Sequence, residues 1–303
     1  MSIFKHLFFN QCWYVAYRTI SFEEPLPQVS KKYLYTIVPT KKNTWIADPF
    51  LFKVQDKMYL ICELTNIKKS KAVIGAKELF NKKVYVEPIL EYPGHLSYPC
   101  IFEKENQIFM IPETEYLNQV VLLKNNVWPN KWTQEKILMQ KIKAADSTFF
   151  LNNGEPSIFI YENSPMKKLH LYTMKNENCV LLKSYESNNG RPAGKTLHLN
   201  GKDIRVAQPC LKFYGEKVEF LAYSLNGNNY FEKKIGEISK ENIILDKKIK
   251  ICGVHTFNRL ENVEVIDILS YKFDLLKPLK TLLKKIGIFG YDFADLRNKK
   301  IYG

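Results

Sequence analysis

Short apolar runs, rich in aromatic and β-branched residues, alternate with polar turns along most of the chain. One arrangement recurs: an apolar run, a polar turn, a second apolar run and then a carboxylate. It is found at residues 48–63, 98–113 and 146–162. Short apolar runs bounded by turns are typical of β-strands. Each copy therefore predicts a β-hairpin, and successive copies begin about 50 residues apart.

Two more apolar runs follow the hairpin in each copy, so each period holds four predicted strands. Four strands in such a period are typical of a β-propeller blade. A looser fourth copy begins at Arg191, and a fifth, which lacks two strands, begins at His255. The N-terminal segments Cys12–Ile20 and Lys32–Val38 can supply the missing strands and close the ring. We therefore expect an all-β, five-bladed β-propeller over residues 1–270, with blades that begin near residues 48, 98, 146, 191 and 255.

The end of the chain has a different pattern. Leucines alternate with lysines at near-helical spacing from Phe273 to Ile286, and Gly287 can end the helix. We expect a basic amphipathic helical tail over residues 271–303. Such a helix can lie on an anionic membrane surface, or it can pack its leucines against the propeller and leave its lysines in water. The pattern leaves both alternatives open.

Composition narrows the class of protein. The 303 residues are 46% hydrophobic and 14% aromatic, which supplies a large core and excludes disorder as the main state. No apolar run approaches the roughly 20 residues that a membrane-spanning helix requires. Six cysteines lie far apart without a CxxC pair, which favours free buried thiols over a zinc site. The first ten residues do not resemble a signal peptide, so we expect a cytoplasmic protein, or one that is peripheral at the inner face of the cell membrane.

The net charge of +14 favours anionic partners such as acidic lipids or phosphate-bearing substrates. A composition rich in lysine, asparagine and aromatic residues is equally typical of an AT-rich genome. The lysine pairs are scattered and no RNA-binding signature is present, which argues against a nucleic-acid partner. No dinucleotide, Walker or HExxH motif is present, and we expect no cofactor and no metal. Asp48, Asp146 and a nearby glutamate are nevertheless ligands that a divalent cation accepts in a wet pocket.

The residues that open the five copies carry the candidate chemistry. In a propeller, the first strand of each blade lines the central axis, so these residues converge at one mouth of the channel. They are Asp48, Tyr98, Asp146, Arg191 and His255. The second strands end nearby, in Glu63, Glu113, Glu162, Gln208 and Asp267. Burying such groups is costly unless they pair with one another or face water. The pattern therefore predicts one of two things: a charged functional site in a solvent-filled pocket, or carboxylates that cap turns and join neighbouring blades.

Facing carboxylates suit sugar chemistry, because one can take a proton from a hydroxyl or a water while another, with a raised pKa, protonates a leaving oxygen. Trp45, Tyr98 and Phe149 offer aromatic faces for sugar rings. Arg191 and His255 can hold a phosphate or a sugar carboxylate through charged hydrogen bonds.

Several short motifs, in this order, resemble one known family. They are Trp45–Phe52, His95–Pro99, Ile111–Glu113, Asp146–Phe150, Arg191–Gly194, Arg205 with Gln208, Tyr214–Gly215 and His255–Thr256. The family is the propeller domain found at the N-terminus of plant glucosamine inositolphosphorylceramide transferases and in bacterial surface-glycan gene products. The resemblance spans about residues 45–267. This domain is more distantly similar to five-bladed glycoside hydrolases of families 32, 43 and 62.

The similarity to these hydrolases implies a general base at Asp48 and, at Asp146, a carboxylate that orients or tunes the acid. Their general acid is a glutamate that opens the fourth blade, and this chain has Arg191 there. An arginine cannot donate a proton at neutral pH. Hydrolysis therefore needs a substitute acid, for which the candidates are Glu113, Glu63 and Glu232. A sugar donor with a phosphate leaving group needs positive charge instead, which Arg191, Arg205 and His255 carry.

Three functions follow from these residues. The first is a glycosyltransferase of surface-glycan or glycolipid biosynthesis, which takes a nucleotide-sugar donor and a glycan or glycolipid acceptor, with Asp48, Asp146 and Glu113 as catalytic residues. The second is a glycoside hydrolase of the family 43 type with a relocated acid. The third is a non-catalytic sugar-binding propeller. The predicted substrate-binding residues are Arg191, His255, Tyr98, His95, Arg205, Gln208, Trp45, Glu63 and Glu232.

Overall fold

The computed structural model describes residues 7–21, 23–67, 71–164, 167–175, 178–186, 190–209, 211–226, 229–279 and 281. The chain forms two compact units. One is Trp13–Leu269, and the other combines Met1–Cys12 with Ser270–Gly303. Among the residues described, no helix is long and apolar enough to cross a membrane.

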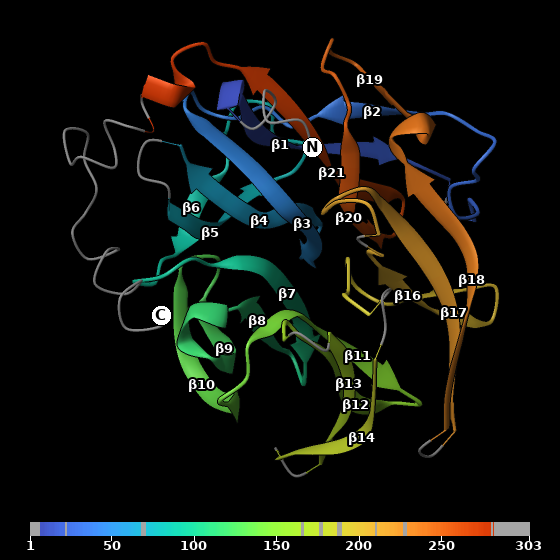
Figure 1. Ribbon diagram of the computed structural model, residues 1–303. Helices are drawn as coiled ribbons and strands as arrows, with labels where there is room; N and C mark the ends of the chain where they lie inside the picture. The colour runs from blue at the N-terminus through green and yellow to red at the C-terminus, as the bar shows by residue number, and fades with distance from the viewer. Residues whose placement is uncertain are drawn as a thin grey trace. The chain divides into compact units, whose positions relative to one another are not determined.

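Four of the five sheets are each formed by strands that follow one another in the chain (Figure 1). Blade 1 contains β3 (Thr44–Val54), β4 (Lys57–Asn66), β5 (Lys71–Glu78) and β6 (Glu87–Leu90). Blade 2 contains β7 (Ser97–Lys104), β8 (Gln107–Glu113), β9 (Gln119–Val127) and β10 (Lys131–Gln140). Blade 3 contains β11 (Ala144–Asn152), β12 (Glu155–Glu162), β13 (Lys168–Lys175) and β14 (Asn178–Glu186). Blade 4 contains β15 (Leu197–Leu199), β16 (Lys202–Ala207), β17 (Lys217–Asn226) and β18 (Asn229–Ser239).

The fifth blade combines strands from both ends of the chain. Its order is β19 (Ile243–Leu245), β2 (Tyr33–Ile37), β1 (Phe9–Thr19), β21 (Val263–Phe273) and β20 (Gly253–Leu260). Figure 1 shows the blue β1 and β2 in the same blade as the red-brown β20 and β21. The 3₁₀ turns Glu115–Leu117 and Lys240–Asn242 lie between strands. The predicted all-β, five-bladed propeller is confirmed.

Aromatic side chains from neighbouring blades pack against one another and form much of the core. Phe50 of blade 1 meets Tyr98 of blade 2 edge-on, with ring centroids 4.9 Å apart. Phe220 of blade 4 and Phe257 of blade 5 have the same arrangement at 4.9 Å. All four rings are fully buried. Burial of such a ring stabilises the fold by about 1.5–3 kcal/mol, so the aromatic runs that predict the strands also hold the blades together.

A β-bulge interrupts the first hairpin in blades 1, 2, 3 and 5, close to the start of its inner strand. In three of these blades the bulge contains a non-glycine residue with a left-handed backbone. These residues are Asp48 (φ 48°), Tyr98 (φ 43°) and Asp146 (φ 49°). Such backbone is uncommon for residues other than glycine, and a bulge changes the direction of a side chain. The repeat thus places one redirected side chain at the same point in each of these blades.

At each of these three bulges, the backbone N–H of the left-handed residue donates a hydrogen bond to a carboxylate of the preceding blade. The Asp48 N–H donates to Asp267 Oδ2 (3.0 Å), and the Tyr98 N–H donates to Asp48 Oδ2 (3.1 Å). The Asp146 N–H donates to Glu113 Oε2 (3.1 Å). A buried N–H without an acceptor is costly, so these carboxylates stabilise the junctions between blades. They have the blade-tying role that the sequence left open.

A short helix near the C-terminus is confirmed at residues 277–279. The predicted tail beyond residue 281 lies outside the described residues. Leu275, Leu276 and Leu279 are more than half exposed. The boundary between the propeller and the tail at residue 270 stays a prediction.

Candidate active site

The bulges bring charged side chains from several blades together at the hub. Asp48 comes from β3, Asp146 from β11 and His255 from β20, while Arg191 precedes the short inner strand of blade 4. Asp48, Asp146 and His255 are each less than 5% exposed. The side chain of Arg191 is 19% exposed. The convergence expected from the sequence is therefore present, and it consists of two ion-paired clusters.

The first cluster is a buried row of two carboxylates with an imidazole between them. His255 Nε2 lies 3.1 Å from Asp48 Oδ1, and His255 Nδ1 lies 2.7 Å from Asp267 Oδ2. Burial alone would lower the pKa of His255, but the two carboxylates outweigh it and hold the pKa well above its ordinary value. Burial alone would raise the pKa of Asp48, and the charges of His255 and Arg191 outweigh it and lower the pKa. This cluster therefore holds an imidazolium between two carboxylates.

Asp267 organises this row. Its Oδ1 accepts hydrogen bonds from the N–H groups of His255 (3.1 Å) and Thr256 (2.9 Å), while Oδ2 accepts the Asp48 N–H. Its side chain is fully buried. Asp267 is not among the site residues predicted from the sequence. The sequence did place it near the hub, because it shares with Glu63 and Glu113 the position at or near the end of a predicted second strand.

The second cluster lies around Arg191. Its Nε donates to Asp146 Oδ2 (2.5 Å), and its Nη2 donates to Asp146 Oδ1 (3.3 Å) and lies 3.6 Å from Glu113 Oε2. The Gln208 amide also donates to Asp146 Oδ2 (2.9 Å). Burial and the charge of Asp146 raise the pKa of Glu113 well above its ordinary value, although Arg191 opposes them. Arg191 and Asp146 are thus a fixed ion pair beside a carboxyl group that retains its proton to a higher pH.

Glu63 and His95 form a third group next to Asp48. Glu63 Oε1 accepts a hydrogen bond from the Thr65 hydroxyl (2.8 Å) and lies 3.5 Å from His95 Nε2. Burial and the charge of Asp48 raise the pKa of Glu63 well above its ordinary value. The His95 side chain is 54% exposed. Trp45 is half-buried and pairs with Thr65 across the β3–β4 hairpin, so the structure places it near this group.

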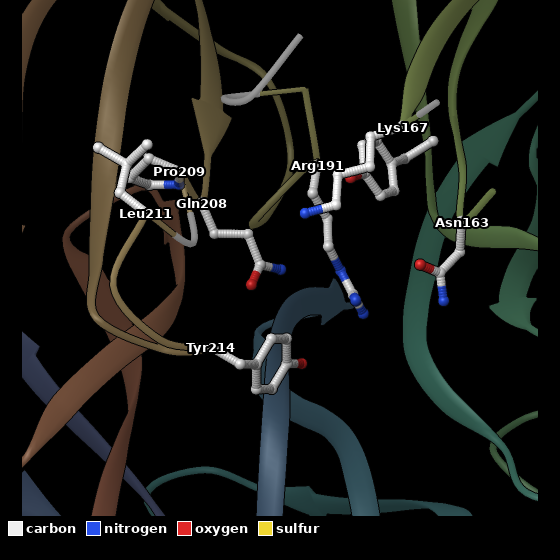
Figure 2. Close-up of a pocket in the computed structure, with 8 residues that line it drawn as sticks. Asn163, Lys167, Arg191, Gln208, Pro209, Leu211 and Tyr214 are labelled. Atoms are coloured by element: carbon white, nitrogen blue, oxygen red, sulfur yellow. The ribbon is translucent and has the colours of Figure 1, made fainter. Parts of the chain in front are cut away.

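A pocket of about 370 Å³ opens beside the second cluster, between loops of blades 3 and 4. Its lining consists of Tyr161, Asn163, Lys167, Arg191, Gln208, Pro209, Leu211 and Tyr214. Figure 2 shows the Arg191 guanidinium and the Gln208 amide pointing into this space, with the Tyr214 ring below them. Two cations, two amides and an aromatic face suit a ligand that is both anionic and hydroxylated.

Sequence reasoning did not predict Lys167 and Asn163. Both lie in the loop after β12, where nothing in the local pattern marks them. Trp13 was also missed. Its ring lies 4.4 Å from that of His255, and Tyr214 contacts both His255 (4.9 Å) and the Arg191 guanidinium (5.0 Å). Aromatic faces beside two cations stabilise them through cation–π attraction.

Two predicted substrate-binding residues, Tyr98 and Arg205, are buried where they cannot meet a ligand directly. Tyr98 is fully buried, and its hydroxyl bonds to Thr148 (2.8 Å) and accepts the Gly194 N–H (2.8 Å), so its role is to join blades. Arg205 is 1% exposed and forms a bidentate pair with Glu232 (2.8 and 3.0 Å). This pair lies over Phe159, between blades 3 and 4, because the side chain of Arg205 points away from the hub.

Among the described residues, one group has the spacing of a metal site. It consists of the buried Asp48, His255 and Asp267, whose ligand atoms lie within 4.8 Å of one another. In the present arrangement both imidazole nitrogens of His255 face carboxylates, and the imidazolium supplies the positive charge that a cation would bring. The absence of a metal and of a cofactor stays a prediction.

These features define a five-bladed propeller with carboxylates and paired cations around its axis. The chain belongs to the family described as "Glucosamine inositolphosphorylceramide transferase 1, N-terminal", whose model matches residues 36–250. The resemblance found in the motifs is therefore confirmed.

The chain is similar to named proteins of this family from plants. It is 28% identical to glucosamine inositolphosphorylceramide transferase 1 of Arabidopsis thaliana over 202 residues. The alignment covers 58% of this chain and 25% of that protein. It is 27% identical over 197 residues to the protein of the same name from Oryza sativa subsp. japonica, covering 58% of this chain and 26% of the rice protein. The chain thus spans about a quarter of the length of these relatives.

Solved structures share the fold. An α-L-arabinofuranosidase from Podospora anserina superimposes with a TM-score of 0.58 over 81% of this chain and 98% of that chain, at 8% sequence identity. At so low an identity, the likeness establishes the propeller architecture alone.

Proposed function

We propose that this chain is a glycosyltransferase that moves a sugar from a phosphate-activated donor, such as a nucleotide sugar, to a hydroxyl of a glycan or glycolipid. The observation that carries the proposal is the pocket that Lys167 and Arg191 both line, since the Arg191 guanidinium is also paired with Asp146 of the hub. The names of the plant relatives support the class of reaction and a glycolipid acceptor.

The leaving phosphate occupies the pocket in this proposal. Asp146 neutralises and fixes Arg191, so the guanidinium orients the phosphate, and Lys167 adds a net positive charge. As the bond from the sugar carbon to the phosphate oxygen breaks, its electron pair leaves with the phosphate. Cations already in place stabilise that developing charge, so no proton donor is needed.

Asp48 is the proposed base. The acceptor oxygen attacks the sugar carbon, and its proton passes to Asp48 and then to solvent. The lowered pKa of Asp48 keeps it ionised at neutral pH, and it takes the proton late, when the acceptor oxygen has become positively charged. Direct attack at the sugar carbon predicts inversion. Glu113 and Glu63, whose pKa values are raised, are the proposed hydrogen-bond partners of the sugar hydroxyls.

The proposed acceptor surface is a membrane. The exposed leucines at 275, 276 and 279 and the net charge of +14 support peripheral contact with an anionic bilayer. The inner face of the cell membrane is the proposed location.

The test is turnover with a panel of nucleotide sugars and inositol-phosphate glycolipids, followed by mass spectrometry of the products. Lys167→Ala should raise the donor KM about tenfold, the scale of one lost charged hydrogen bond. The exposed Lys202→Ala on blade 4 is the matched control and should leave KM unchanged. An unchanged donor KM in Lys167→Ala would contradict the assignment of this pocket to the donor phosphate. Binding of donor without turnover would favour the sugar-binding propeller.

Hydrolysis of a glycosidic bond is a second candidate, which the raised pKa of Glu113 favours. A raised pKa at Glu113 and a lowered pKa at Asp48 suit the acid and the base of an inverting hydrolase. The rate of hydrolysis should fall as pH rises through the pKa of Glu113. The rate of transfer from a phosphate donor should not fall over the same pH range. Glu113→Gln should lower hydrolysis by about 10²–10⁴-fold and transfer by about tenfold at most.

A further inference from the structure

The loop over residues 211–215, with the sequence Leu-Lys-Phe-Tyr-Gly, displays apolar side chains to solvent at the pocket mouth. Leu211 is 63% exposed, Phe213 43% and Tyr214 41%. The side chain of Lys212, between them, is 80% exposed. Isolated exposed apolar residues are ordinary, but three within four residues beside a pocket mark an interaction surface.

The base of this loop is packed against the propeller. Gly215 has φ 78°, and a Cβ added there would lie 2.7 Å from the Trp13 ring. A Cβ added at Gly253 would lie 1.8 Å from the Gly215 carbonyl oxygen, so the backbones of the loop and of β20 are in close contact. Only glycine allows this approach. The loop is therefore held at its base, and its apolar side chains project from it.

The same loop forms part of the candidate active site. Leu211 and Tyr214 line the pocket that contains Arg191 and Lys167 (Figure 2). Lys212 lies 3.6 Å from Glu216, but this pair is exposed at the lysine end and contributes little attraction. Lys167 and two large side chains of the loop, Leu211 and Tyr214, thus line one opening, and the exposed Lys212 lies in the same loop.

We propose that residues 211–215 are a membrane-docking loop, in which Leu211 and Phe213 enter the interface of an anionic bilayer while the pocket opens onto the lipid headgroups. The inference rests on the proposed glycolipid acceptor. Apolar side chains gain free energy by leaving water at the acyl boundary, and lysines beside them are attracted to anionic headgroups. A second copy of the chain is a poorer partner, because two molecules of charge +14 repel each other.

The experiment is co-sedimentation of the full chain with vesicles of phosphatidylcholine, with or without phosphatidylserine, and without any sugar donor. Wild type should bind the mixed vesicles. Leu211→Ser with Phe213→Ser should bind them at least about tenfold more weakly, since each side chain contributes more than the 1.4 kcal/mol that corresponds to tenfold. The matched control is Phe231→Ser with Leu151→Ser, which removes two exposed side chains of similar size from strands β18 and β11 and should bind like wild type.

A second measurement reports contact directly. Leu211→Trp should show a blue-shifted fluorescence component when mixed vesicles are added, while Phe231→Trp should not. Vesicle binding needs no sugar donor. Wild type that binds the vesicles but transfers no sugar would therefore overturn the proposed function and leave this inference intact. Equal binding by the loop variant and wild type, no binding by wild type, or self-association of wild type that only the loop variant abolishes would overturn it.

Discussion

At the scale of residues, the hub separates carboxyl groups with the same solution chemistry into two kinds. Asp48 faces an imidazolium, and its pKa is lowered. Glu113 is buried beside Asp146, and its pKa is raised despite Arg191. The difference arises because the cations are committed to the aspartates, at 2.5–3.1 Å, and Glu113 is left 3.6 Å from Arg191. Carboxyl groups whose pKa values are shifted in opposite directions within one site are typical of acid–base and ligand-binding sites.

Glu113→Gln tests this separation through stability. The folded state retains the Glu113 proton to a higher pH than the unfolded chain, so its contribution is complete below the unfolded pKa of about 4.5 and is lost as pH rises through the folded pKa. As pH rises above about 4.5, wild type should therefore lose more unfolding free energy than Glu113→Gln. Urea denaturation of both proteins at a series of pH values measures this difference. The exposed Glu105→Gln is the control, and parallel wild-type and Glu113→Gln curves would contradict the shift.

Sequence reasoning located the hub residues better than it described their contacts. The repeat identifies Asp48 and Asp146, because each opens an apolar run at the same point of its copy. It cannot show that Arg191 pairs with Asp146, since the partners are 45 residues apart and come from different blades. Arg205 shows the same limit: it lies three residues before Gln208, which faces the hub, yet its side chain points between blades.

At the scale of elements, the inner strands combine a regular repeat with an irregular start. The hairpins were predictable, because alternating apolar runs and turns determine strands locally. The bulges were not, because they follow from the packing of blades around an axis rather than from local propensity. Asp48 and Tyr98 adopt left-handed backbone without being glycine or asparagine. Such conformations persist where the surroundings over-determine them, and here the hydrogen bonds that these N–H groups donate to carboxylates of the preceding blades do so.

Tyr98→Phe tests the blade junction. The change removes the acceptor of the Gly194 N–H (2.8 Å) and leaves that buried group unpaired. The free energy of unfolding should fall by about 1–3 kcal/mol. Tyr85→Phe, at a 44% exposed ring, should change it by less than about 0.5 kcal/mol. Chemical denaturation of both variants measures the difference, and equal stability would show that the Tyr98 hydroxyl does not join the blades.

At the scale of the whole molecule, the ring closes without a covalent bond, because β1 and β2 complete the sheet that β20 and β21 begin. The Ile20 N–H donates to the Asn262 carbonyl (2.8 Å), and the Val38 N–H donates to the Val15 carbonyl (2.9 Å). The sequence predicted this closure from two missing strands. It could not predict how blades are coupled, since the coupling depends on hub contacts between distant residues.

We expect the propeller unit to unfold as one cooperative structure, because each of the hub carboxylates Asp48, Glu113 and Asp267 holds a backbone N–H of the following blade. Ala16→Pro should show this. Ala16 is fully buried in the middle of the closing sheet, opposite Ile37, and proline removes a ladder hydrogen bond there. Leaving the buried partner carbonyl unpaired costs about 1–3 kcal/mol, which corresponds to a fall in Tm of about 2–12 °C for a unit of this size.

The control for Ala16→Pro is Leu181→Pro, on the outermost strand of blade 3, where the side chain is half exposed and one edge of the strand pairs with no strand among the described residues. It should lower Tm less, because an edge strand tolerates proline. Calorimetry and near-ultraviolet circular dichroism should give one coincident transition for Ala16→Pro. If blade 5 instead melts separately while the other aromatic signals persist, the hub contacts do not couple the blades, and the carboxylates that tie them serve the site alone.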